Sequence, residues 1–544
     1  MKKQLSMAGV CLMGTMAFGA EPLVLDMVHH NPGEPLYESA YNDPAVIQEM
    51  GYNGKVYFLF ESPMLAINWE SVDPEILPKG SPDRAWVDAK AKTVREHLAS
   101  CKALGMKTYA MSDMVLLPKR LIEKEGLEES FGDARNPRVQ ELIRAQVREM
   151  FGQFEDFDGL VVRIGETYLH DAPFHQGAIQ DKGSVEKTII PLMQLLREEV
   201  CVKLNKQLIF RTWRSFDSEL DPYRKVSRAV EPHENLIISI KHCEGDFHRG
   251  NPFSKIIGEG RHQQIVEVQC AREYEGKGAY PNYICKGVIE GFEEHANMPA
   301  DAISSLRDWT EQTPELYAGI WTWTRGGGWD GPYITSEFWP DLNAWVMAQW
   351  ANDPSQREED LFNQYAKEKL TLNRADVARF RELCLLSADA VVRGRNTTHR
   401  DMNEWWTRDQ GIGWPEPAQT AEGQARNLRQ KEESILMWKQ IVKLSKAIQW
   451  DSPATKEFVV GSATYGLHLY EIYRAAVYLS DAEARDDVAA MKRWIGVYDA
   501  AWKTYNRLPE QFHSLSSLYT KEYARHCENP LDQKVERLRA EWMK

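Results

Sequence analysis

The chain alternates short apolar runs with helical patterns eight times between residues 23 and 323. Each run is rich in β-branched or aromatic residues and is bounded by polar or turn-forming residues, which is typical of buried parallel strands. The eight predicted strands cover residues 23–28, 55–60, 106–111, 159–164, 207–213, 236–241, 265–270 and 318–323. Amphipathic helices are predicted between most of them, at 86–104, 137–151, 184–204 and 300–310. Eight strand–helix repeats predict an α/β fold, a closed (β/α)8 TIM barrel with enlarged loops.

An open, doubly wound sheet is the alternative arrangement of such repeats. The Gly-x-Gly-x-x-Gly pattern that marks many of these sheets does not follow the first predicted strand, which lowers this alternative. After Asp341 the strand pattern gives way to long helical periodicities. Helices are predicted at 356–370, 374–395, 421–450, 457–479, 482–508 and 530–543. We therefore expect a catalytic barrel over residues 21–350 and a C-terminal α-helical domain over 351–544.

The first 20 residues have the pattern of a secretory signal peptide. Lys2 and Lys3 precede an apolar stretch at 7–18, and Gly19 and Ala20 follow it as small residues. The pattern predicts cleavage near Ala20 and export to a bacterial periplasm or to the cell exterior. Of the eight cysteines, Cys11 lies in this stretch, in a poor context for lipidation. The other seven are scattered without Cys-x-x-Cys pairs, which indicates neither a disulfide framework nor a zinc site.

Charge and hydropathy narrow the classes of partner. The net charge of −14 argues against a nucleic-acid partner. Beyond the signal peptide, no stretch reaches the roughly 18–20 uncharged residues that a membrane span needs. Eighteen tryptophans suit either a large core or the stacking of sugar rings. The helical domain offers a surface on which a homodimer could form.

Carboxylates follow three of the predicted strands. Glu166 comes soon after the fourth strand, and Asp246 and Glu273 come after the sixth and seventh. Barrel enzymes keep their chemistry at this end of the strands. Glycoside hydrolysis needs one carboxyl group that protonates the leaving oxygen and another that activates water or attacks the anomeric carbon. The pattern predicts a glycosidase in which Asp246 and Glu273 raise each other's pKa and hold a base near working pH.

Structural roles stay open for the same region. Glu166 could instead form a salt bridge with Arg163, and Asp246 could cap a turn. Glu267 lies in mid-strand, so we expect it inside the barrel and paired with a base. Glu275 is expected to be solvated.

Basic and aromatic residues also gather at the predicted strand ends. Arg163, Arg211 and Lys241, with His242 beside the last, could bind a negatively charged sugar, because cations that converge in an acidic pocket suit a uronic acid. Their alternative role is to neutralise the catalytic carboxylates. The loop after the eighth strand is rich in glycine and tryptophan and suits a sugar-stacking wall or a lid. Its candidate binding residues are Trp323, Arg325 and Trp329.

Residues 240–276, IKHCEGDFHRGNPFSKIIGEGRHQQIVEVQCAREYEG, resemble the α-glucuronidases of glycoside hydrolase family sixty-seven. The matching elements are Lys241, Gly245-Asp246-Phe247, Asn251-Pro252-Phe253, Glu273-Tyr274 and Gly276. Asp158-Gly159 leading to Glu166, Phe210-Arg211, and the run at 339–370 extend the resemblance. The family carries an N-terminal α/β domain before its barrel, whereas here the first strand directly follows the predicted signal peptide.

The resemblance implies an inverting, exo-acting enzyme that removes a uronic acid from oligosaccharides and needs no cofactor or metal. It implies that Glu166 is the general acid, that Asp246 and Glu273 activate water, and that Arg211 and Lys241, with Arg163, hold the uronate. Two alternatives stay open: a related barrel glycosidase, retaining or inverting, for another α-linked or acidic glycan, and a glycan-binding barrel without activity.

Overall fold

The computed structural model describes residues 21–29, 38–57, 63–164, 172–178, 184–213, 216–243, 245–299, 302–326, 331–408, 411–521 and 529–543. The predicted signal peptide, Glu166 and Trp329 lie outside the described residues.

Eight parallel strands close into a barrel in the order β1-β2-β3-β5-β7-β8-β9-β10, with β10 pairing back onto β1. Their bounds are β1 Leu23–His29, β2 Gly54–Tyr57, β3 Lys107–Asp113, β5 Gly159–Arg163, β7 Gln207–Arg211, β8 Leu236–Lys241, β9 Gln263–Gln269 and β10 Tyr317–Gly326. Each overlaps one of the eight predicted strands, so the predicted closed barrel is confirmed. A separate two-stranded antiparallel sheet pairs β4 (Leu116–Pro118) with β6 (His175–Gly177).

The two faces of each strand pack into different cores, because side chains alternate along a strand. Leu25 and Met27 of β1 point into the barrel, whereas Val24 and Val28 pack outward. One small cluster fills the interior: Leu23, Leu25, Met27, Val56, Tyr109, Met111, Val161, Ile209, Ile237, Ile265, Trp321 and Trp323, with Cys243 and Phe247 packed against it. Apolar residues therefore occupy both faces, as expected for parallel strands covered by helices.

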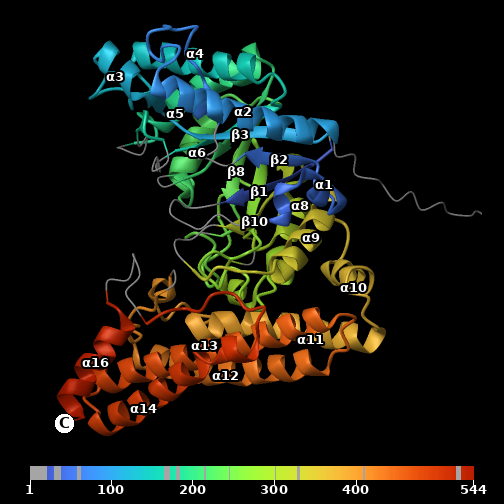
Figure 1. The fold of residues 1–544 in the computed structure, drawn as a ribbon, viewed down its shortest axis with the longest axis vertical. Coiled ribbons are helices and arrows are strands. Elements are labelled where there is room, and N and C mark those ends of the chain that lie inside the picture. Colours follow the sequence, from blue (N-terminus) through green and yellow to red (C-terminus); the bar gives the residue numbers. More distant parts are fainter. Residues whose placement is uncertain are drawn as a thin grey trace, which may run out of the picture.

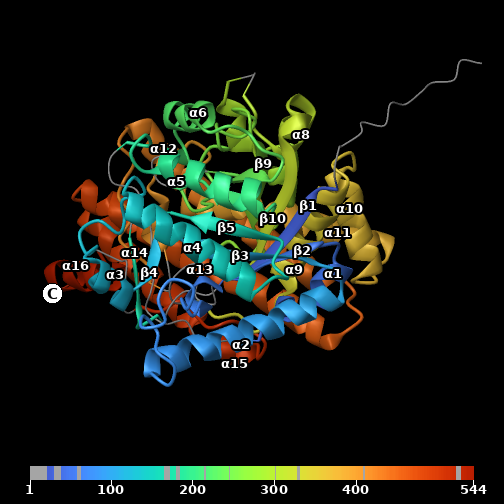
Figure 2. The ribbon, with the colours of Figure 1, turned by 90° about the horizontal axis from the view of Figure 1, so that it is seen from above.

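Helices surround the barrel and connect its strands (Figure 2). They are α1 Pro44–Glu49, α2 Pro82–Ala103, α3 Lys119–Glu125, α4 Pro137–Gln153, α5 Ile189–Leu196, α6 Leu220–Ala229, α7 Cys285–Glu290 and α8 Leu306–Gln312, with a π-helical turn at Arg197–Lys203 and 3-10 turns at Ala40–Asn42, Pro63–Ala66, Glu293–Asn297 and Pro314–Leu316. Local signals start the longest ones. Ser81 and Asn136 each accept hydrogen bonds from the first turn, and a proline follows each at the first helical position.

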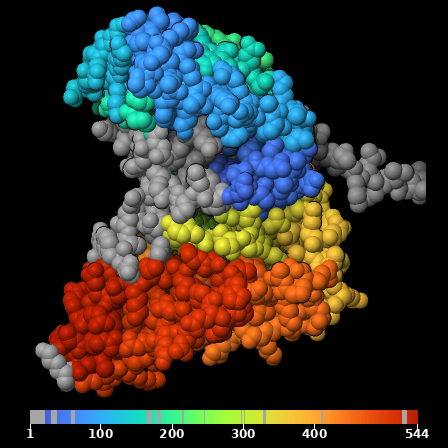
Figure 3. Space-filling model, in the orientation of Figure 1, coloured from blue at the N-terminus to red at the C-terminus, as the bar shows by residue number. Residues whose placement is uncertain are grey.

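The C-terminal half is helical. It contains α9 Phe338–Asn352, α10 Glu358–Glu368, α11 Arg374–Arg395, a 3-10 turn at Glu404–Thr407, α12 Ala421–Ala447, α13 Pro453–Ala484, α14 Val488–Tyr505, α15 Leu508–Gln511 and α16 Leu531–Trp542. The α9 helix packs on β10, and we call α10 to α16 the helical part. In Figures 1 and 3 most of this part forms a continuous layer, orange to red, below the barrel. Among the described residues, no helix has the length and apolar character that a membrane span requires.

The loops that follow β8 and β9 face the helical part. Arg249, after β8, pairs with Glu294 and with Asp389 of α11. Glu275, after β9, pairs with Arg272 and with Arg395 of α11. The carboxyl ends of these strands, where barrel enzymes keep their active sites, therefore lie on the side covered by the helical part.

Candidate active site

The loop after β8 turns sharply at its predicted acidic residue. Gly245, Asp246 and Phe247 have φ angles of 61°, 54° and 64°. Two consecutive non-glycine residues in this left-handed region are unusual, and such strain collects at functional sites. The turn directs Phe247 into the barrel mouth, where its ring contacts Trp323 at 5.5 Å between centroids.

Asp246 forms an ion pair with the last residue of β8. Lys241 Nζ lies 2.5 Å from Asp246 Oδ1, and 26% of the aspartate side chain is exposed. Burial opposes ionisation of Asp246, but the charge and hydrogen bond of Lys241 outweigh it and lower the pKa to about 2. Asp246 is therefore a carboxylate across the neutral pH range.

Glu273 follows β9 and has the opposite character. The residue before it, Arg272, has φ 60°, and Gln269 at the end of β9 accepts a hydrogen bond from the Glu273 backbone N–H. The glutamate is 8% exposed. Burial first, and then the negative charge of Asp246, raise its pKa to about 7, although Lys241 partly counteracts them.

The structure places Asp246 and Glu273 in each other's electrostatic field, but only Glu273 has the raised pKa that the sequence led us to expect for both, because Lys241 lowers that of Asp246. Their titrations depend on each other, because each sits in the other's field at the ends of two neighbouring strands. One group is ionised while the other exchanges its proton near neutrality. Such a pair can accept or donate a proton during catalysis at physiological pH.

A third carboxyl group, that of Asp217, lies in the electrostatic field of Lys241 and Asp246. The sequence did not single it out. Burial raises the pKa of Asp217, with Lys241 lowering it and Asp246 raising it further. It follows β7, so it extends the acidic row to a third adjacent strand end. An acidic residue six positions beyond a strand was the available signal, and it is a weak one.

Inside the mouth, Arg211 pairs with Glu267. Arg211 Nε lies 2.7 and 2.9 Å from the two Glu267 oxygens, and both side chains are almost fully buried. The expectation that Glu267 is a barrel-interior residue paired with a base is confirmed. Arg211 Nη2 has no hydrogen-bond partner among the described residues, nor has the indole N–H of Trp213 or Trp323.

Aromatic rings surround these cations. The Arg211 guanidinium carbon lies 4.7 Å from the ring centre of Trp323 and 5.1 Å from that of Trp213. Lys241 Nζ lies 3.9 Å from the ring centre of Trp213. Unpaired buried donors beside aromatic faces form a lining that suits a ligand rich in oxygen atoms and with apolar ring faces, as a sugar has.

The other basic residues singled out from the sequence also have acidic or structural partners. Arg163 makes two hydrogen bonds to Asp113, at 2.6 and 2.9 Å. Arg325 lies 2.9 Å from Glu337. His242 is buried: its Nδ1 lies 3.3 Å from the Glu267 carbonyl oxygen, and burial lowers its pKa well below the usual value. With Lys241 facing Asp246 and Arg211 facing Glu267, each of the four predicted cations pairs with a carboxylate.

One sequence expectation is wrong. Glu275 is not solvated but 2% exposed, because Arg272 and Arg395 enclose it. Burial opposes its ionisation, yet the two guanidinium groups lower its pKa to about 2. Arg395 lies 120 residues further along the chain, so no local pattern marks this contact.

The helical part contributes residues that the sequence reasoning missed. Arg408 Nη2 donates to the Tyr274 hydroxyl at 2.5 Å, and the Arg408 guanidinium carbon lies 4.3 Å from the Tyr274 ring centre. The same carbon lies 4.7 Å from the ring centre of Trp405. His248 stacks on Tyr274 at 5.2 Å and contacts Trp405 at 4.5 Å. We call His248, Tyr274, Trp405 and Arg408 the aromatic clamp.

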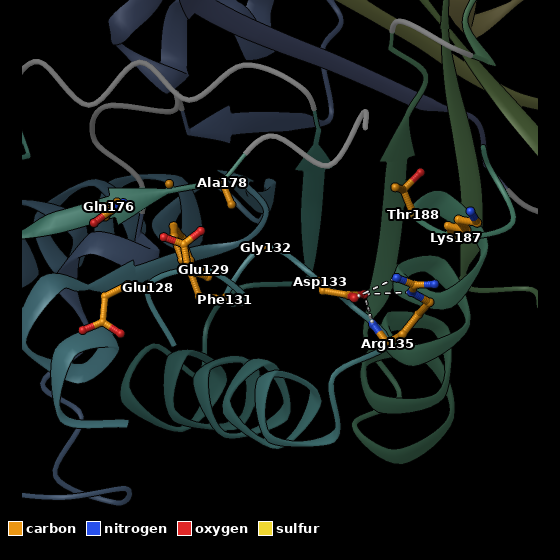
Figure 4. A pocket seen from close by; sticks show the side chains of 11 residues that line it. Glu128, Glu129, Phe131, Gly132, Asp133, Arg135, Gln176, Ala178, Lys187 and Thr188 are labelled. Carbon is orange, nitrogen blue, oxygen red and sulfur yellow. Dashed lines mark hydrogen bonds and ion pairs between the residues drawn. The ribbon is translucent and has the colours of Figure 1, made fainter. Parts of the chain in front are cut away.

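A cavity of about 500 Å³ lies elsewhere, among the α3–α4 loop, β6 and the start of α5 (Figure 4). Glu128, Glu129, Asp133, Arg135 and Lys187 give it a mixed charge. It contains none of the predicted site residues. Among the described residues, no group of three or more His, Cys, Asp or Glu side chains could hold a metal ion.

Comparisons with known proteins show a shared fold. No family model matches the chain, and no curated protein matches its sequence. A solved GH138 enzyme targeting pectin rhamnogalacturonan II aligns over 96% of this chain and 83% of its own, with a TM-score of 0.58 and 10% identity. The fold is that of this enzyme. A GH89 enzyme from Clostridium perfringens, solved with its substrate GlcNAc-alpha-1,4-galactose, aligns with a TM-score of 0.48 and 11% identity over 84% of this chain and 50% of its own. The resemblance to family sixty-seven stays a prediction.

Proposed function

We propose that this protein is a glycoside hydrolase whose active site lies at the carboxyl ends of β7, β8 and β9. The observation that carries the proposal is the pair of Asp246 and Glu273. Two carboxyls share one field at the mouth of a closed barrel, and their pKa values lie far apart, at about 2 and about 7. Groups with values separated in this way are typical of acid–base catalysis. The fold shared with the GH138 enzyme also supports the proposal of a glycoside hydrolase.

In the proposed reaction, the pair activates water. Glu273, with its pKa near working pH, takes a proton from a water molecule, and the ionised Asp246 helps to orient that water. The water oxygen forms a bond to the anomeric carbon while the glycosidic bond breaks. Glu166, three positions after the end of β5 in the sequence, donates the proton that the leaving oxygen needs. Direct attack by water inverts the anomeric configuration.

Glu273 could instead act as a covalent nucleophile, which would retain the anomeric configuration. Its raised pKa does not separate the two roles, because a general base and a nucleophile both act in the ionised form. Measuring by NMR which anomer is released first separates the two mechanisms.

We further propose that the sugar is a uronic acid, released from a plant or algal polysaccharide fragment by an exported enzyme of α-glucuronidase type. Lys241 and Arg211 line the mouth beside Trp213. The Nη2 group of Arg211 is a buried donor that has no hydrogen-bond partner in the described part of the chain. Planar guanidinium groups match carboxylates well. Because Asp246 and Glu267 already balance these cations, selectivity for an acidic sugar over a neutral one should be moderate.

Turnover of defined glycans by the wild type and by Glu273→Gln tests the proposal. Substrates are glucuronoxylan oligosaccharides, rhamnogalacturonan II fragments and other uronic-acid glycans, with released monosaccharide measured by chromatography. We expect Glu273→Gln to lower kcat/KM at least about 1,000-fold, because the amide cannot accept the proton. Glu259→Gln is the matched control, because Glu259 pairs with Arg224 on the protein surface and should keep full activity.

Two results would contradict the proposal. Wild-type protein that binds these glycans without releasing any sugar would indicate a glycan-binding barrel. Glu273→Gln with unchanged kcat/KM would remove Glu273 from the reaction.

A further inference from the structure

Asp246 and Glu273 occupy the same position in two short turns. The first turn spans residues 245–248 and the second spans 272–275, and in each the last backbone N–H donates to the first carbonyl oxygen, at 3.3 and 2.9 Å. Each carboxyl residue is therefore the second residue of a four-residue turn closed by a hydrogen bond. Such a bond holds a turn together, but it does not fix one turn relative to the other.

Glu275, the last residue of the second turn, joins the two turns. Its Oε1 accepts a hydrogen bond at 2.5 Å from the backbone N–H of Arg249, which directly follows the first turn. Its Oε2 accepts from Arg272 Nε at 2.8 Å and from Asn282 Nδ2 at 3.3 Å. Arg395 Nη1 of α11 lies 3.4 Å from Oε1. A carboxylate has about four lone-pair positions, so these four donors match its capacity.

Arg395 carries the same connection into the helical part. Its Nε donates to Thr407 Oγ1 at 2.7 Å, and its carbonyl oxygen accepts from the Trp406 indole at 2.9 Å. The 3-10 turn Glu404–Thr407 is thereby anchored on α11. Glu275 and Arg395 are each 2% exposed, so these contacts are shielded from water. The two barrel loops and this turn of the helical part therefore meet at one buried carboxylate.

We propose that Glu275 is a positioning residue, which fixes the loops after β8 and β9 to each other and so sets the separation between Asp246 and Glu273. The inference rests on the proposed function and deepens it by naming the group that holds the reacting pair in place. Burial opposes the ionisation of Glu275, but Arg272 and Arg395 outweigh it and hold its pKa at about 2, so it takes no part in the proton transfer. A displacement of about 1 Å in a reacting group can cost about 100-fold in rate, which gives this link its importance.

The titration of Glu273 reports the separation. Burial first, and then the charge of Asp246, raise its pKa to about 7. Lys241, Gln269 and Arg408 act in the opposite direction. If the two loops move apart, Asp246 recedes and water enters, so both causes of the raised value weaken and the pKa falls towards 4.5.

Glu275→Asp separates the position of this carboxylate from its charge. The shorter side chain keeps the charge, but at the present loop spacing it cannot reach both Arg249 and Arg272. Potentiometric titration of each protein, minus that of the same protein carrying Glu273→Gln, gives the midpoint of Glu273 without any turnover. We expect this midpoint to fall by at least about half a pH unit in Glu275→Asp.

Glu199→Asp is the matched control. Glu199 is a carboxylate with 1% exposure that pairs with Arg148 of α4, in the helical layer around the barrel. Shortening it disturbs a buried ion pair to a similar degree, but it should leave the midpoint of Glu273 in place. An unmoved or raised midpoint in Glu275→Asp, or an equal fall in Glu199→Asp, would overturn the inference.

Kinetics give a second readout that a merely structural role would not move. Glu275→Asp should lower kcat about 10- to 100-fold and change KM less than about threefold, because a misplaced reacting pair slows the chemical step more than it weakens binding. The limb of kcat/KM that reports Glu273 should move to lower pH together with the titration midpoint. Equal kcat in Glu275→Asp and the wild type would contradict the positioning role.

Failure of the proposed function is distinguishable from failure of this inference, because the titration needs no substrate. If the wild type releases no sugar from any glycan, the proposed function fails and the midpoint alone decides the inference. A fall in Glu275→Asp that is absent from Glu199→Asp then still supports the link between the loops, and an unmoved midpoint overturns it.

Discussion

The barrel mouth and the adjoining interface with the helical part both bury charged groups, yet they treat them differently. At the interface, Glu275 and Glu294 each face guanidinium groups directly, and in both cases these overcome burial and lower the pKa. At the mouth, Glu273 has a carboxylate as a strong neighbour, and its pKa rises to about 7. Glu273 and Glu275 are two residues apart on the same loop. Glu275, whose charge is balanced by two arginines, holds the loop in place. Glu273, whose charge is only partly balanced, can exchange its proton near neutral pH.

The largest expected effect concerns Glu275, the buried carboxylate whose charge is fully paired. Glu275→Gln leaves Arg272 and Arg395 buried without their shared carboxylate, so we expect the free energy of unfolding to fall by about 3–5 kcal/mol. Denaturant unfolding followed by fluorescence measures the change. Glu259→Gln at the surface should change it by less than about 1 kcal/mol. Equal effects of the two substitutions would show that the interface network is not a stabilising element.

A second prediction concerns Lys241, the cation at the barrel mouth that lowers the pKa of both carboxyls. Lys241→Met removes the cation that lowers the pKa of both Asp246 and Glu273, so both values rise. With Glu273 as the base, activity requires its ionised form. The acidic limb of kcat/KM, expected near pH 7 in the wild type, should then move to higher pH, with a loss of about 10- to 100-fold at pH 6.

Whether activity falls below or above pH 7 shows whether Glu273 acts as a base or as an acid. Activity that instead falls above pH 7 would assign Glu273 the role of the acid. Lys225→Met, which removes a surface partner of Glu186, is the control and should leave the limb in place.

The smallest expected effect concerns stability and pH. The folded pKa of Glu273 is raised from 4.5 to about 7, so the folded state binds the proton more tightly than the unfolded state does. Its favourable contribution is fully present below about pH 4.5 and is lost as the pH rises through 7. Glu273→Gln should therefore have a Tm close to that of the wild type at pH 5, and a Tm about 1–3 °C higher at pH 8. Calorimetry at the two pH values makes the comparison, and a parallel shift at both would contradict it.

The sequence was most informative where burial acts on every residue of a segment. The range at 236–241 matches β8 residue for residue, because both faces of a barrel strand must be apolar. Loops were harder to interpret, because their partners lie far away in the chain. Arg163 pairs with Asp113 and Arg325 with Glu337, and neither pair has a local spacing signal.

The same limit applies to the site. Asp246 and Glu273 were recognisable because each closely follows a strand, and strand ends converge in a barrel. Arg408 follows no strand and reaches the site only because α11 and its following turn pack against the loop after β9. Its position beside Tyr274 depends on tertiary packing that a pattern within one sequence does not encode.

The anchoring of residues 404–408 has a consequence for how chains of this fold could diversify. All eight strands precede this segment, so an excised barrel would keep its carboxyls and lose the indole and guanidinium beside them. Exchanging the C-terminal half between related chains would then change the surroundings of the barrel mouth while leaving Asp246 and Glu273 in place. The lining of the mouth and its carboxyls would be inherited on separate stretches of one polypeptide.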